Sequence, residues 1–186
     1  YGGRADVREI FLPMLKTQSF SDRFLAAEYF AKEAHSVPLL ISLLAQKPVP
    51  ADATLWALSQ RLRFESDEAA IEIAKRYLEQ LGNSEAFYAL GIYQILGISP
   101  DLSTWESFKK GRFSLQRRLL EILVSTRHPQ ASLWLRHCLD SPDPATRGDA
   151  LWAIGRLGIF EEWSVSALLS AARSSLPMES INALAS

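Results

Sequence analysis

Along most of this chain, apolar residues recur with the three- and four-residue spacing of amphipathic helices. In the first such stretch, from Asp6 to Thr17, Val7, Ile10, Phe11 and Met14 would share one helical face. Gly, Pro, Ser or Asp interrupts the pattern at short intervals, as turns between antiparallel helices require. The further predicted helices cover residues 24–30, capped by Ser21 and Asp22, and residues 39–44, 55–62, 69–81, 85–96, 102–110, 115–125, 129–139, 145–157, 161–174 and 178–185.

The first helix of each successive pair carries a similar phrase, which in four of six cases is alanine followed by a large apolar residue and in two is glutamate followed by one. Taking the large residue as an anchor, the phrase recurs every 29 to 32 residues. The anchors are Tyr29, Leu58, Leu90, Ile122, Ile154 and Leu184. A period near thirty on helical patterning is typical of stacked helical hairpins.

The repeat predicts an all-α fold, a right-handed α-solenoid of about five helical hairpins, forming a single domain over residues 1–186. The chain starts on an unpaired second helix and stops within a first helix. Solenoids usually end in polar capping repeats, whereas Ile181 and Leu184 would lie on an uncapped end. We therefore expect the sequence to be an excerpt of a longer chain; the alternative is that the last helix is itself the cap.

One repeat also carries a recognisable motif. Asp143, Pro144 and Arg147 are followed by Ala150 and by the run 153–158, Ala-Ile-Gly-Arg-Leu-Gly. This stretch resembles HEAT-like repeats, in particular the subtype first associated with phycobilisome lyases. The other repeats match more thinly. The resemblance implies the fold only, since such repeats occur in scaffolds, adaptors, regulators, lyases and a few glycosylases.

The repeat register assigns several conspicuous residues to packing. Trp56, Tyr88 and Trp152 each stand two places before an anchor, so we expect them to pack between neighbouring repeats. Gly91 and Gly155 each follow an anchor inside a predicted helix, where glycine costs about 1 kcal/mol relative to alanine. Close approach of two helices is the expected reason for both glycines.

Composition limits the choice of function. The net charge is −1 among 186 residues, which argues against a general polyanion binder. Cys138 is the only cysteine, so no intrachain disulfide can form. This favours a cytoplasmic protein and is compatible with an exported one. No apolar run is long enough to span a bilayer.

Charge is nevertheless uneven, because residues 109–147 hold eight Lys and Arg against three acids, a net charge of +5. In HEAT solenoids the second helices usually line the concave face. A basic patch there would suit an acidic peptide or a phosphate group. The alternative is a set of solvated faces, with Arg147 making the contact usual for arginine in this repeat. The candidate partner-binding residues are Lys109, Lys110, Arg127, Arg136 and His137.

Trp163 is a separate candidate, because it falls off the apolar stripe of its helix and lies beside two glutamates. One interpretation makes it an exposed anchor for a partner, and the other makes it a cover for the seam between repeats.

The sequence offers little for catalysis. The three histidines and Cys138 show no metal-ligand spacing, and no phosphate loop or nucleophile elbow is present, so we expect no cofactor and no metal. Too few basic residues lie together to make the several phosphate contacts that nucleic-acid binding needs. The sequence thus predicts a non-enzymatic scaffold, regulator or adaptor for protein–protein interaction, which binds a protein or an acidic peptide segment on its concave face. The alternative is an enzyme or enzyme subunit, similar to a bilin lyase or a DNA glycosylase.

Overall fold

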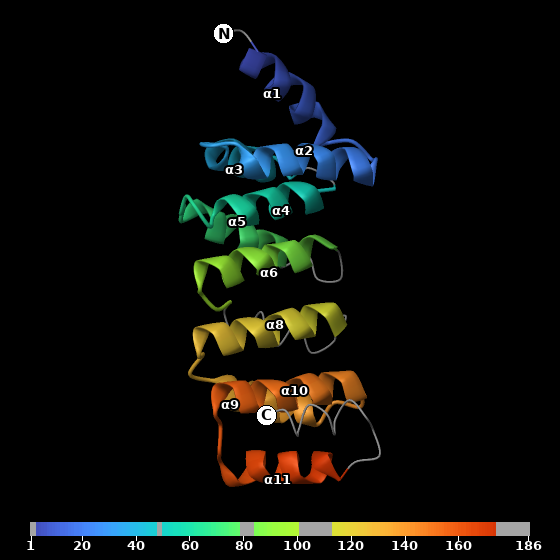
Figure 1. Ribbon diagram of the computed structural model, residues 1–186, viewed down its shortest axis with the longest axis vertical. Helices are drawn as coiled ribbons and strands as arrows, with labels where there is room; N and C mark the ends of the chain where they lie inside the picture. The colour runs from blue at the N-terminus through green and yellow to red at the C-terminus, as the bar shows by residue number, and fades with distance from the viewer. Residues whose placement is uncertain (1–2, 48–49, 79–83, 101–112, 174–186) are drawn as a thin grey trace. The chain divides into compact units, whose positions relative to one another are not determined.

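The chain is all-helical in the computed structural model, which describes residues 3–47, 50–78, 84–100 and 113–173. These segments hold ten helices and no strand (Figure 1). The helices are α1 Gly3–Met14, α2 Phe20–Lys32, α3 Val37–Ala45, α4 Asp52–Arg61, α5 Ala69–Leu78, α6 Ser84–Leu96, α8 Phe113–Thr126, α9 Ala131–Leu139, α10 Pro144–Leu157 and α11 Glu162–Ala172. The predicted all-α class is therefore confirmed.

Helix ends differ from the predicted ones by a few residues. The cap of α2 is Ser19 rather than Ser21, because the Ser19 hydroxyl accepts a hydrogen bond from the backbone N–H of Asp22 at 3.4 Å. Helix α9 begins at Ala131, two residues later than predicted. The predicted helices over 102–110 and 178–185 lie outside the described residues.

Two compact units divide the chain, residues 1–105 and 106–186. In the first unit, α2 packs against α4 and α4 packs against α6, while α3 and α5 pack against each other and against this row (Figure 1). Helix α1 packs on α2, where Phe11 stacks on Tyr29 with ring centroids 4.8 Å apart. In the second unit, α10 packs against α8, α9 and α11. The continuous right-handed solenoid stays a prediction.

The repeat anchors form the core of each unit. Leu58, Leu90, Ile122 and Ile154 are all 0% exposed, as their register predicts. Tyr29 is half-buried, and Leu184 lies outside the described residues. Since full burial of such an aliphatic side chain contributes about 1.5–3 kcal/mol, the repeated anchors are a major source of stability.

A buried ion pair joins α2 to α4. The Arg23 guanidinium donates from Nε and Nη2 to the two carboxylate oxygens of Asp52, each at 3.0 Å. Its Nη1 donates to the backbone carbonyls of Thr17 and Gln18, at 3.1 and 2.9 Å. Both charged side chains are about 95% buried. This one guanidinium therefore fixes α4 and the turn before α2 in relation to α2.

Arg147 repeats part of this arrangement in the second unit. It stands four residues after its helix cap, Asp143, as Arg23 stands four residues after Ser19. Its Nη1 donates to the carbonyls of Ser141 and Pro142, at 2.7 and 2.9 Å. The arginine of the motif thus ties its own helix to the preceding turn in both units.

Removing the Asp52 carboxylate tests the ion pair. Asp52→Ala leaves the Arg23 guanidinium buried without its anionic partner, and we expect a loss of about 3–5 kcal/mol in the free energy of unfolding. Urea denaturation followed by far-UV circular dichroism measures it. Lys32→Ala, which breaks the exposed pair with Glu28, is the control and should hardly move the midpoint. Equal shifts in the two variants would contradict the assignment.

Acid sensitivity should arise in part from Asp143, which caps α10. The hydroxyl and the backbone N–H of Thr146 donate to this carboxylate and lower its pKa. A lowered folded-state pKa gives stability that is present above the unfolded value, about 3.9, and is lost as the pH falls through the folded-state pKa. Asp143→Asn keeps the cap without the titration. The advantage of the natural chain over this variant, measured as urea midpoints, should be full near pH ~7 and shrink steadily as the pH falls below ~4. A gap independent of pH would contradict this.

Candidate functional site

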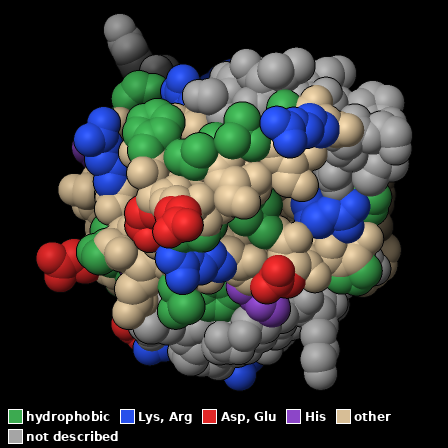
Figure 2. Space-filling view, turned by 90° about the horizontal axis from the view of Figure 1, so that it is seen from below, with side chains coloured by type: hydrophobic (Ala, Val, Ile, Leu, Met, Phe, Trp, Pro, Cys, Tyr) green, Lys and Arg blue, Asp and Glu red, His purple; other side chains and the backbone are tan. Residues whose placement is uncertain are grey.

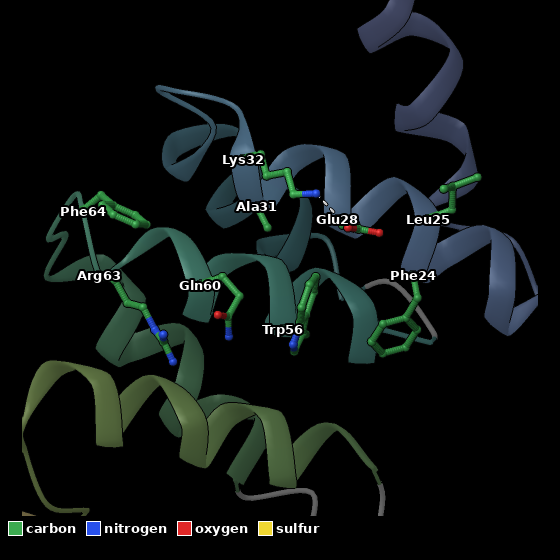
Figure 3. Close-up of a pocket in the computed structure, with 9 residues that line it drawn as sticks. All are labelled: Phe24, Leu25, Glu28, Ala31, Lys32, Trp56, Gln60, Arg63 and Phe64. Carbon is green, nitrogen blue, oxygen red and sulfur yellow. Dashed lines mark hydrogen bonds and ion pairs between the residues drawn. The ribbon is translucent and has the colours of Figure 1, made fainter.

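A groove runs over α2, α4 and the turn that follows α4 (Figure 3). Its volume is about 690 Å³, and most of its lining is apolar. Helix α2 contributes Phe24, Leu25, Glu28, Ala31 and Lys32, and α4 with its following turn contributes Trp56, Gln60, Arg63 and Phe64.

Helical periodicity explains why these side chains share one surface. Trp56 and Gln60 are four residues apart and so lie on one side of α4, and Arg63, in the turn after α4, points to the same side (Figure 3). The same spacing relates Phe24, Glu28 and Ala31 on α2. Because α2 packs on α4, the two rows face a common groove.

Aromatic rings gather at the Phe24 end of this groove. The Phe24 ring centroid lies 5.9 Å from that of Trp56 and 5.9 Å from that of Tyr88 on α6. Trp56 and Tyr88 are half-buried, and the contact of Trp56 with Phe24 confirms the predicted packing between neighbouring repeats, whereas Tyr88 reaches the first repeat from the third. The packing leaves part of Trp56 to line the groove, a role that the register alone did not predict.

The other end of the groove carries Phe64, which is 77% exposed. The guanidinium of Arg61 lies 5.5 Å from the centre of its ring and also pairs with Glu65. Glu65 in turn accepts a hydrogen bond from the backbone N–H of His35 at 3.0 Å. Both neighbouring charges are thus engaged, while the face of Phe64 toward solvent is uncovered.

The charges within the groove are unequal in their pairing. Lys32 donates to Glu28 at 2.7 Å, and this hydrogen bond, together with the positive charge, lowers the pKa of the Glu28 carboxyl. Arg63 is exposed and has no hydrogen bond or ion pair with any residue that the structure describes. The groove therefore carries one guanidinium, that of Arg63, which has no partner among the described residues.

The structure describes only some residues of the predicted basic patch. Lys109 and Lys110 lie outside the described residues. Arg127 is exposed, with a positive φ of 47° at the end of α8. His137 is exposed and meets Trp134 edge to face, with ring centroids 6.3 Å apart.

Arg136 and Trp163, predicted separately, lie together with Glu161. The Arg136 guanidinium pairs with the Glu161 carboxylate at 3.2 Å and lies 4.7 Å from the centre of the Trp163 ring. The Trp163 indole N–H donates to the same carboxylate at 2.6 Å. The indole and the Ser132 hydroxyl lower the Glu161 pKa, as does Arg136. The positive charge of Arg136 is thus compensated locally by one of the two glutamates beside Trp163, a pairing that the sequence did not predict.

These contacts bear on the two interpretations of Trp163. Its side chain is half-buried, and through Arg136 it joins α11 to α9. This is the contact expected of a residue that covers a seam between repeats.

Figure 2 views the molecule from the side on which α11 lies and shows acidic, basic and hydrophobic side chains interspersed there.

Other site classes have few residues to draw on. Within the described segments, no three His, Cys, Asp or Glu side chains come together in a group that could hold a metal ion. No helix in those segments is long and apolar enough to cross a membrane. Comparisons with family models, with curated proteins and with solved structures return no match. The candidate site therefore has to be interpreted from its own geometry.

The reactivity of Cys138 provides a check on local burial. Burial, with a smaller effect of the Asp149 carboxylate, raises the pKa of the Cys138 thiol to about 11. At pH ~8 its thiolate fraction should be roughly a hundredfold below that of an exposed cysteine. Higher intrinsic nucleophilicity offsets part of that loss. We expect Ellman's reagent to react at least about tenfold more slowly with the native chain than with the chain in urea. Equal rates would show that the thiol is open to solvent.

Proposed function

We propose that this chain is a non-catalytic protein-binding module built of HEAT-like helical hairpins, and that a partner segment docks in the groove over α2 and α4. The observation that carries the proposal is the exposed aromatic surface of this groove, where Phe64 is 77% exposed and Trp56 is half-buried. The HEAT-like class is supported by the thirty-residue register and by the shared contacts of Arg23 and Arg147.

Physical reasons favour binding at this surface. Large apolar side chains scattered singly on a surface need no explanation, but a groove lined by several of them, with charged residues at its edge, is typical of an interaction site. Tryptophan and arginine are also enriched among the residues that dominate binding energy. Trp56 and Arg63 lie in one groove, seven residues apart along the chain.

The second unit offers a weaker surface. The sequence favoured a concave face with Arg127, Arg136 and His137, but Arg136 is paired with Glu161. An exposed pair of this kind contributes little and leaves little net charge for a partner. The groove of the first unit is therefore the preferred site, and the basic residues of the second unit stay secondary candidates.

A peptide selection tests the proposed function. The chain, biotinylated and immobilised, is exposed to a phage-displayed library of random peptides, and enriched sequences are synthesised with a fluorescent label. Trp56→Ala should weaken their binding at least about tenfold in fluorescence anisotropy, because it removes the largest side chain of the groove.

Phe160→Ala is the matched control, since Phe160 is an aromatic residue of the second unit and is 74% exposed. It should leave peptide affinity unchanged. Absence of any enriched peptide would overturn the proposed function. Equal losses in the two variants would place binding outside the groove.

A further inference from the structure

From the charge and spacing of the groove we infer the kind of segment it takes: a short stretch with an apolar anchor for Phe24 and Trp56 and a carboxylate for Arg63. This inference rests on the proposed function and adds the chemistry of the partner.

After local pairing, the net charge at the Phe64 end of the groove is positive. Arg61 and Glu65 pair with each other, which leaves Arg63 as the lining residue whose charge has no partner among the described residues. A guanidinium offers planar, paired donors that match a carboxylate geometrically. The opposite charge of a partner would therefore be recognised here, and a cationic partner would be repelled.

The other charges of the groove do not cancel this preference. Lys32 and Glu28 form an exposed pair one helical turn apart, with side chains 75% and 57% exposed. Such pairs are weak, and they add no net charge. The nine lining residues thus carry two cations and one anion, a net charge of +1 that is located at Arg63.

The distance between Trp56 and Arg63 sets the spacing between the apolar residue and the acidic residue of the partner segment. Trp56 lies on α4 and Arg63, seven residues later, lies in the turn that continues it, so a helical rise of about 1.5 Å per residue would put their backbones about 10 Å apart. An extended segment advances about 3.3 Å per residue, so its carboxylate should stand about three residues from its apolar anchor. A helical segment would need a spacing of about seven residues.

This chemistry favours a peptide over other occupants. Nucleic acid and anionic membranes require several cations acting together, whereas this groove presents one free guanidinium. Its aromatic end needs an apolar side chain, which a peptide can place beside a carboxylate. A second copy of the chain is the remaining occupant, and the experiment separates it from a peptide.

The test uses three immobilised baits and one random peptide library. The baits are the natural chain, Arg63→Glu and the control Arg156→Glu, which makes the same charge change at an exposed arginine of α10. We expect Asp or Glu near an aromatic or aliphatic residue in the peptides selected by the natural chain and by the control. Arg63→Glu should instead select Lys or Arg at the same spacing.

Binding affinities then test whether reversing the charge at residue 63 is offset by reversing the charge in the peptide. A peptide selected by the natural chain should lose about tenfold in affinity for Arg63→Glu and regain it when its acidic residue is replaced by arginine. Thermal unfolding checks that the exposed substitution leaves the fold intact.

Other outcomes would overturn the inference. Peptides without charge preference, or the same acidic preference with all three baits, would remove Arg63 from recognition while leaving the proposed function standing. A mass in sedimentation that doubles for the natural chain and returns to that of one chain in Arg63→Glu would identify a second copy as the occupant. A library that yields no peptide at all would instead count against the proposed function.

Discussion

The ion pair between Arg23 and Asp52 is the constraint on which the candidate site depends. It is buried, it joins α2 to α4, and the same guanidinium holds the turn before α2 through two backbone carbonyls. Phe24 directly follows Arg23, and Trp56 lies one turn beyond Asp52. The register that the ion pair sets between the helices is therefore the register that brings these two rings to 5.9 Å.

In the first unit, α4 uses one face for packing and another for the groove. One face of α4 buries Leu55 and Leu58 completely, while another carries Trp56 and Gln60 into the groove. Because the buried face holds the helix in place, the groove is formed without a partner. A preformed surface of this kind loses little entropy on binding, which suits a module that recognises short segments.

The sequence predicted the features that depend on local periodicity. The helices, the burial of anchors such as Leu90 and Ile154 and the packing of Trp56 against the neighbouring repeat follow from spacing along one chain. Pairings between distant residues could not be read in this way. The burial of Arg23 with Asp52, the compensation of Arg136 by Glu161 and the groove at Phe64 arise only when separate helices meet. The repeat register assigned Trp56 to packing alone. In the structure its half-buried ring both packs against Phe24 and lines the groove.

The central claim is that a partner segment binds over α2 and α4. Amide hydrogen exchange of the 186-residue chain, with and without a saturating selected peptide, tests it most directly. The account predicts that added protection is confined to residues 20–32 and 52–64, with residues 131–173 unchanged. Protection that appears in α9 to α11 and spares α2 and α4 would contradict it.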